Sequence, residues 1–254
     1  MTMDRDELIA ACDALLTASR FRDYTENGLQ VQGRPSVTRV LSGVTASQAL
    51  LDEAVAWQAD LVLVHHGYFW KNEPVAITGM KRQRIATLLQ HDINLLAYHL
   101  PLDAHPSLGN NACLAQRLGL EVEGALDAPL GEGLLWYGRL AEPMKVAEFG
   151  GHVGHCLSRQ PLLIEAPGGK PISRVAWCTG GAQDMIGAAA EAGMDAFISG
   201  EISERTTHIA REMGIHYLAA GHHATERYGV QALGQWLNQQ YGVEHRFVDI
   251  DNPA

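Results

Sequence analysis

The chain has 254 residues, is 46% hydrophobic and 19% charged, and carries a formal net charge of −10 at pH 7. This composition is ordinary for a globular protein, and the length suits one large domain or two small ones. The acidic balance argues against a nucleic-acid polymer as the main partner, because a phosphate backbone favours a basic protein surface. The acidic balance does not exclude a single nucleotide as a ligand, because a metal ion could neutralise the negative charge of the nucleotide.

The cysteines and the N-terminal segment indicate a cytoplasmic protein. The four cysteines lie far apart and none belongs to a CxxC pair, so we expect reduced thiols rather than disulfides. The segment MTMDRDELIA has early acidic residues and lacks the apolar core of a signal peptide. No apolar run approaches the ~18 residues of a membrane span, so we expect no membrane association.

Short apolar runs alternate with helical patterns along the first half of the chain. A helix is predicted at 4–19, with Asp4 as its N-cap and Glu7 three residues later, as in a capping box. The later elements are strands at 38–43, 61–65, 93–98 and 120–124, and helices at 46–58, 81–91 and 110–118. This alternation predicts βαβ units and a largely parallel sheet.

The chain contains an internal repeat. The segment RVLSGVTASQALLDEAVAWQADLVLVHHG, from Arg39, aligns with RVAWCTGGAQDMIGAAAEAGMDAFISGE, from Arg174, at an offset of 135. INLLAYHLPLD then resembles IHYLAAGHHATE, and GLEVEGALD resembles GVEHRFVDI, at offsets of 122 and 123. We predict two internally duplicated α/β domains, 1–127 and 128–254. Chance similarity between βα motifs is the alternative.

Residues 128–173 fall between the two copies and form an insertion in the second domain. Its pattern predicts a strand at 133–140, a helix at 144–157 and a strand at 161–166. The segment APGGKP at 166–171 predicts a turn or linker before the second copy begins.

Imidazoles and carboxylates gather at the ends of four predicted strands. These residues are His65, His66, His99, Asp103, Glu201, His222, His223 and Glu226. Ligands of open parallel sheets bind at the carboxyl ends of the strands. A lone histidine at a strand end is more often structural, but the convergence of four strand ends predicts a site.

The spacing of these residues sets geometric conditions. Neighbouring strand residues point to opposite faces, so His65 and His66 reach one site only if the chain leaves the strand there. Gly67 permits such a turn. In HLPLD, Pro101 predicts an extended or turning segment rather than a helix, which lets His99 and Asp103 face the same side.

His222 and Glu226 are four residues apart and share a face if a helix starts near His222. His223 would then point elsewhere. An ordinary polar pair at a helix start is the alternative. A set of imidazoles with two or three carboxylates suits Zn, Fe, Mn, Co or Ni, whereas Ca and Mg prefer oxygen ligands. The charges of the carboxylates favour two divalent ions per chain.

Several segments together resemble the Nif-three-like family, and most closely its bacterial YbgI branch. They are NGLQV (27–31), SGVTAS (42–47), VHHGYFWK (64–71), HLPLDAHPSLGNNA (99–112), CTGG (178–181), ISGE (198–201) and AAGHHATER (219–227). Members of this branch carry the label GTP cyclohydrolase 1 type 2 homolog, and the resemblance spans nearly the whole chain.

This resemblance implies two interlinked α/β domains, a dinuclear metal site in the cleft between them, and a toroidal homohexamer. The metal ligands it implies are His65, His66, Asp103, His222 and Glu226, with the glutamate bridging both ions. The sequence matches the family motif at all five positions.

The expected function is that of a dinuclear metal-dependent hydrolase acting on a nucleotide or a related small metabolite, with GTP cyclohydrolase-like chemistry as the implied candidate. The sequence contains no Walker loop, and nothing in it identifies GTP as the substrate. The candidates for proton transfer are His99, Glu201 and His223. A non-catalytic metal-binding or scaffold assembly is the alternative.

Overall fold

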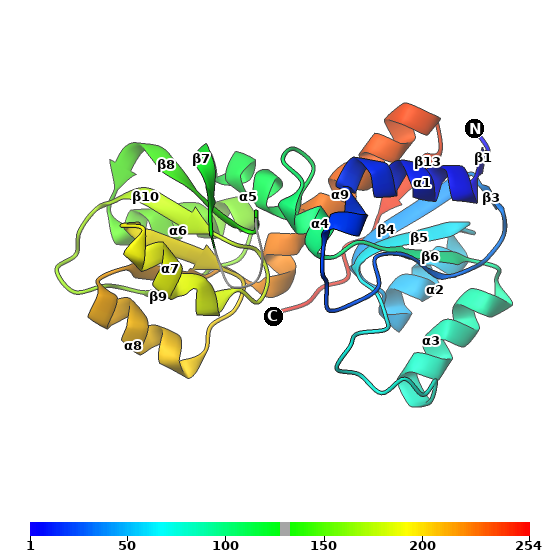
Figure 1. Cartoon of the computed structure of the whole chain (residues 1–254), viewed down its shortest axis with the longest axis horizontal. Coiled ribbons are helices and arrows are strands. Elements are labelled where there is room, and N and C mark those ends of the chain that lie inside the picture. Colours follow the sequence, from blue (N-terminus) through cyan, green and yellow to red (C-terminus); the bar gives the residue numbers. More distant parts are fainter. Residues whose placement is uncertain (128–132) are drawn as a thin grey trace. The chain divides into compact units, whose positions relative to one another are not determined.

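The computed structural model describes residues 1–127 and 133–254 and shows a mixed α/β protein (Figure 1). Its chain forms two compact units: Met1–Gly109 with Arg227–Asp251, and Asn110–Glu226 with Asn252–Ala254. The expected domain division after residue 127 stays a prediction, and the start of the expected insertion, 128–132, lies outside the described residues. No helix among the described residues is long and apolar enough to cross a bilayer.

The first unit is built on a five-stranded sheet with the order β13-β4-β5-β6-β2. The strands are β13 (Glu244–Phe247), β4 (Arg39–Thr45), β5 (Leu61–His66), β6 (Asn94–Ala97) and β2 (Gly28–Val31). All neighbours are parallel except β2, which pairs antiparallel with β6 at the edge. A separate two-stranded ribbon joins β1 (Met3–Asp4) to β3 (Ser36–Val37).

Helices cover both faces of this sheet (Figure 1). One face packs against α1 (Arg5–Leu16) and α9 (His222–Tyr241), and the other against α2 (Gln48–Ala56) and α3 (Gly79–Gln90). In β5, Leu61 and Leu63 belong to the first core, and Val62 and Val64 to the second. Alternate strand residues point to opposite faces, so a strand buried on both sides is apolar throughout.

The second unit is built on a six-stranded sheet with the order β7-β8-β10-β11-β12-β9. The strands are β7 (Glu121–Leu126), β8 (Leu135–Met144), β10 (Ile172–Trp177), β11 (Ala196–Ser199), β12 (His216–Ala219) and β9 (Leu162–Ile164). The three central strands are parallel and the others pair antiparallel. The helices of this unit are α5 (Asn110–Leu118), α6 (Val146–Leu157), α7 (Ile186–Glu191) and α8 (Glu204–Met213), and a short 3-10 turn at Gln183–Met185 precedes α7. A second 3-10 turn, Ala18–Arg20, follows α1 in the first unit.

The elements predicted from the sequence are present, with ends that differ by a few residues. Helix α5 has the predicted bounds, and α1 ends earlier than expected because Thr17 adopts a left-handed conformation with φ 48°. Asp4 caps α1 and accepts hydrogen bonds from the N–H groups of Asp6 and Glu7 at 2.8 and 3.2 Å. The four cysteines all lie in the described residues and are reduced thiols rather than disulfides, as expected.

The prediction for HLPLD was wrong, because Leu100–Ala104 forms the short helix α4. Pro101 lies in its first turn, where a helix needs no N–H donor and where the fixed φ of proline is already helical. His99 is the N-cap residue, with φ −98° and ψ −105°. The chain thus turns into a helix directly after β6.

The strand registers support the internal repeat. In the first unit Val40 pairs with Leu61, and in the second Val175 pairs with Ala196, so both partners differ by the predicted offset of 135. Leu61 pairs with Asn94 and Ala196 with His216, which gives the shorter second offset of 122. The two copies therefore share one β-α-β-α-β framework, as the sequence predicted.

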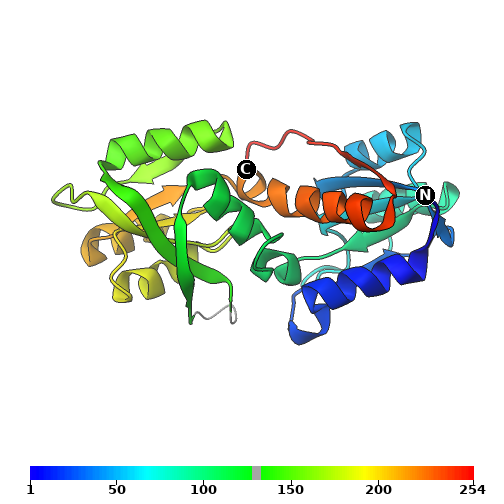
Figure 2. The ribbon, with the colours of Figure 1, turned by 90° about the horizontal axis from the view of Figure 1, so that it is seen from above.

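Each copy also contributes its last helix and strand to the other unit. Strand β7 ends the first copy but belongs to the six-stranded sheet, and β13 ends the second copy but pairs with β4 in the five-stranded sheet. The exchanged strands are not equivalent, because β8 from the insertion separates β7 from β10 (Figure 2). The exchange interlinks the copies and explains why α9 begins in one unit and continues in the other.

Candidate metal site

His65 and His66 are the last two residues of β5, and their ring centroids lie 4.6 Å apart. His65 is fully buried and donates from Nδ1 to the carbonyl oxygen of Tyr98 at 2.9 Å. His66 Nδ1 lies 3.2 Å from the hydroxyl of Thr45, its partner residue on β4. Each ring is therefore held through Nδ1.

The chain leaves the sheet at Gly67, as the sequence predicted. The glycine is required by close packing rather than by a left-handed φ. A Cβ atom there would lie 2.2 Å from Gln30 Oε1 and 2.8 Å from the Cβ of Ala97. No larger residue fits at this position without moving β2 or β6.

The short helix α4 brings His99 and Asp103 close to the paired histidines. Asp103 is buried, and its Oδ1 lies 3.5 Å from His65 Nε2. The His99 ring centroid lies 5.1 Å from that of His65 and 5.9 Å from that of His66. A nitrogen from each of these three rings lies within 4.8 Å of the other two. The first unit therefore gathers three imidazoles and one carboxylate.

Asp23 is a residue of this group that sequence reasoning missed. Its carboxylate accepts a hydrogen bond from His99 Nδ1 at 2.7 Å and others from the Asn27 amide and the Leu100 N–H, each at 2.9 Å. Burial raises the pKa of Asp23, but the bond to His99 and its charge, with those from Asn27 and Leu100, outweigh burial and lower the pKa to about 2. Nothing in the local spacing around Asp23 signals a partner that follows β6.

The second unit places His222 between two glutamates. His222 Nε2 lies 3.0 Å from Glu226 Oε2, one turn along α9, and Nδ1 lies 2.7 Å from Glu201 Oε1. Burial lowers the pKa of His222, but the charges and hydrogen bonds of Glu226 and Glu201 outweigh it and raise the pKa to about 9. The prediction that His222 and Glu226 share a helical face is confirmed.

His223 and Gly180 complete the surroundings of this pair. His223 is buried at the next position of α9, which turns it away from the His222 and Glu226 face, as expected. Gly180, with φ +69°, leaves no room for a side chain: a Cβ atom would lie 2.0 Å from Glu226 Oε1 and 3.1 Å from His222 Nε2. Within the CTGG segment, Gly180 therefore lies directly against the glutamate.

The donor atoms of both units fit a divalent transition metal. Imidazole nitrogens and carboxylate oxygens are the ligands that Zn, Fe, Mn, Co and Ni accept. Ligating histidines usually donate their other ring N–H to a carbonyl, hydroxyl or carboxylate oxygen, which fixes the ring and its tautomer. His65, His66 and His222 each have such an oxygen at Nδ1.

Comparisons with known proteins agree with this architecture. The chain is 57% identical to the GTP cyclohydrolase 1 type 2 homolog of Pseudomonas aeruginosa, with 100% of both chains covered. It is 52% identical to the protein of the same name from Escherichia coli, over 99% of this chain and 100% of that one.

Solved structures extend the comparison to the fold. A protein described as "protein ybgI, unknown function" superposes with a TM-score of 0.96 at 51% identity, covering 99% of this chain and 100% of that chain. TTHA1606 from Thermus thermophilus gives 0.85 at 33% identity, with the same shares covered. The family Duf34/NIF3 (NGG1p interacting factor 3) matches residues 3–253. The chain therefore belongs to the Duf34/NIF3 family.

Proposed function

We propose that the protein is a dinuclear metal-dependent hydrolase that acts on a nucleotide or a related small metabolite. The observation that carries the proposal is that three imidazoles are held in the same way, by an oxygen atom at Nδ1. His65, His66 and His222 each have an oxygen at Nδ1, from Tyr98, Thr45 and Glu201 respectively. Anchoring of this kind is typical of metal-ligating histidines.

The proposed ligands are His65, His66 and Asp103 from the first unit, and His222 and Glu226 from the second. Two divalent ions per chain suit this set, and Glu226 is the proposed bridging carboxylate. Its side chain is 3% exposed and lies against Gly180, so its position is defined by packing. Two such ions, when bound, supply Lewis acidity that activates water near neutral pH and stabilises charge on a leaving oxygen.

The residues of the chain then orient the reactants and move protons. His99, Glu201 and His223 remain the proposed proton-transfer residues. His99 lies beside His65 and His66 and is itself held by Asp23. Glu201 is half-exposed and bonded to His222 Nδ1, so it also orients that imidazole.

The name of the curated relatives suggests the first substrate to test. GTP cyclohydrolase chemistry opens the imidazole ring of a purine by addition of water, which is a reaction that activated water performs. We therefore propose GTP as the first probe, followed by other nucleotides and small phosphorylated metabolites.

The experiment begins with elemental analysis of the full chain after loading with Zn, Mn or Fe and extensive dialysis. We expect two ions per chain in the wild type and a loss of both in Glu226→Gln, because a bridging carboxylate serves both ions. Glu201→Gln is the matched control. A glutamine still accepts from His222 Nδ1, so metal content should stay near two ions while turnover falls.

A Glu226→Gln protein that keeps two ions with unchanged affinity would contradict the bridging role. A ceiling of one ion in the wild type would contradict the dinuclear centre. Two bound ions without hydrolysis of any substrate in the screen would favour a metal-binding scaffold over a hydrolase.

A further inference from the structure

We propose that Asp23 is a positioning residue that fixes the imidazole of His99, with its proton on Nδ1 and with Nε2 directed away from Asp23. This inference rests on the proposed function, because it concerns the proton-transfer role assigned to His99.

The carboxylate of Asp23 can act only as an acceptor in its surroundings. Its side chain is 2% exposed. Oδ1 accepts from His99 Nδ1 at 2.7 Å and from the N–H of Tyr24 at 2.6 Å, and Oδ2 accepts from the Asn27 amide and the Leu100 N–H. An ionised carboxylate has no proton to donate, so Nδ1 of His99 must carry the hydrogen.

With its hydrogen on Nδ1, the imidazole in its uncharged form has the lone pair on Nε2, which leaves that nitrogen as the proton acceptor. Neighbouring rings restrict any rotation that would exchange the two nitrogens. The His99 ring lies 5.0 Å from Trp70, at an interplanar angle of 81°, and 5.1 Å from His65. The backbone N–H of His99 also donates to Asn27 Oδ1 at 2.7 Å. Asp23 and Asn27 together hold both the ring and the main chain of His99.

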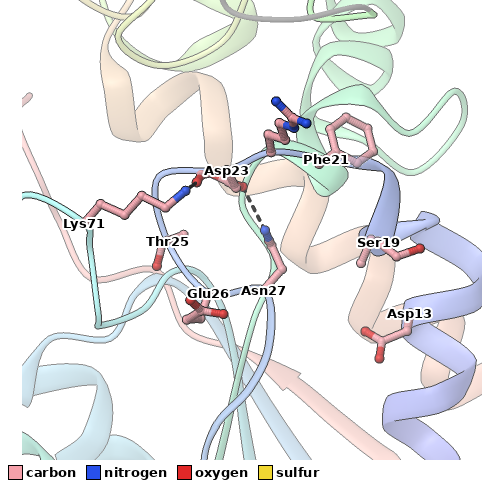
Figure 3. A pocket seen from close by; sticks show the side chains of 10 residues that line it. Asp13, Ser19, Phe21, Asp23, Thr25, Glu26, Asn27 and Lys71 are labelled. Atoms are coloured by element: carbon pink, nitrogen blue, oxygen red, sulfur yellow. Dashed lines mark hydrogen bonds between the residues drawn. The ribbon is translucent and has the colours of Figure 1, made fainter.

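The loop that carries Asp23 is tied to the segment that follows the paired histidines. The Lys71 N–H donates to the Tyr24 carbonyl at 2.8 Å, and the Thr25 hydroxyl donates to the Tyr68 carbonyl at 2.9 Å. The ammonium group of Lys71 donates to the carbonyl oxygen of Asp23. Figure 3 shows the Lys71 side chain reaching Asp23, and Asp23 bonded to Asn27.

These bonds set the position of Asp23 relative to β5 and not merely relative to its own loop. A pocket of about 510 Å³ borders the same loop, between Asp13 and Ser19 on one side and Asp23 and Asn27 on the other (Figure 3). The residues that make these contacts, among them Asp23, Thr25 and Lys71, therefore line the wall of a cavity. The buried carboxylate is accordingly placed to orient His99 rather than to bind solvent.

The test is a long-range ¹H–¹⁵N spectrum of the zinc-loaded full chain labelled with ¹⁵N-histidine, with the His99 signals assigned through His99→Gln. In the wild type we expect the shifts of a protonated Nδ1 and an unprotonated Nε2. In Asp23→Asn the side-chain NH2 group would face the Nδ1–H of His99, which places two hydrogen-bond donors against each other. We therefore expect the shifts to move toward the tautomer with its proton on Nε2. Turnover of GTP should fall about 10–100-fold through kcat, with KM little changed.

Asp60→Asn is the matched control, because Asp60 is a buried carboxylate of the same unit that accepts from two backbone N–H groups and from Arg34. It should leave the His99 shifts and kcat unchanged even if it lowers stability. A wild-type His99 with its proton on Nε2, or an Asp23→Asn protein with wild-type shifts, would overturn the proposal. Even if Asp23→Asn fails to fold, the wild-type spectrum shows which nitrogen of His99 carries the proton and so tests the proposal.

The two proposals can fail separately. Wild-type protein that binds no zinc or hydrolyses nothing would contradict the proposed function. The tautomer of His99 can still be measured in that protein, in the metal-free chain, and it supports or overturns the role of Asp23 independently.

Discussion

Gly180 is the residue whose replacement most directly tests the packing around Glu226. Its φ of +69° already disfavours a side chain, and a Cβ atom would lie 2.0 Å from Glu226 Oε1. We expect Gly180→Ala to displace the glutamate and to lower metal affinity by at least about tenfold, the order of effect seen when the partners of metal ligands are disturbed. Isothermal titration with Zn or Co measures the change.

Gly214 provides the control for Gly180→Ala. It has φ +72°, and a Cβ atom at this position would meet no atom of the described residues within 4 Å. Gly214→Ala therefore carries the same backbone strain without the contact. Both changes should cost about 1 kcal/mol of stability through φ alone. Equal metal affinities in the two variants would show that metal binding by Glu226 does not depend on its close contact with Gly180.

His245 makes the stability of the first unit depend on pH. Its ring packs over Gly234 of α9, with Ser42 Oγ 2.8 Å from Nε2, and burial lowers its pKa to about 4. In the unfolded chain the pKa of this histidine is about 6.5. Between these values the unfolded state binds more protons, so the contribution of neutral His245 is complete above about pH 6.5 and is lost as the pH falls toward about 4.

We therefore expect His245→Gln to lose less stability than the wild type between about pH 7 and pH 5. Urea unfolding at both pH values measures the difference. His208→Gln is the control, because His208 lies exposed on α8 with 63% of its side chain accessible. If His245→Gln loses as much stability as the wild type, burial of this imidazole does not control the acid response.

At the scale of elements, the same turn connects helix to strand in both copies. Asp60 accepts from the N–H groups of Thr38 and Arg39, and Asp195 accepts from those of Ser173 and Arg174. Gln58 and Gly193, at equivalent positions before these aspartates, both have positive φ, 56° and 74°. The carboxylate thus joins the start of one strand to the start of the next.

We expect Asp195→Ala to destabilise the protein by about 1–3 kcal/mol, because it leaves two strand N–H groups without their acceptor. Chemical denaturation followed by circular dichroism measures this loss. Asp184→Ala, which removes an exposed ion pair with Arg205, should cost less than about 1 kcal/mol. A similar small cost for Asp195→Ala would show that solvent replaces the carboxylate in this turn.

At the scale of the whole molecule, the family resemblance implies a homohexamer. We expect light scattering to give six times the chain mass of 27.6 kDa. With a net charge of −10 per chain, assembly should strengthen as salt screens repulsion between subunits. A monomer at every ionic strength would contradict the hexamer and leave the metal proposal untouched.

The local order of elements was predictable, because periodicity and end signals act within a few residues. The strands at 61–65 and 93–98, the helix at 110–118 and the Asp4 cap all follow from such short-range patterns. Pro101 is the exception. Proline disfavours a helical conformation in the residue before it, but here that residue, Leu100, is the first of the helix.

The sequence by itself determined the repeat, the framework of parallel strands and the turn that pairs His222 with Glu226. Each of these is encoded in spacing along one segment or in the similarity of two segments. Only the tertiary structure decided that β7 and β13 exchange sheets, that Gly180 lies against Glu226 and that Asp23 meets His99. These contacts join strands of different copies or residues far apart in the chain, for example Asp23 with His99 at a separation of 76. Such contacts depend on how elements pack, which no local pattern specifies.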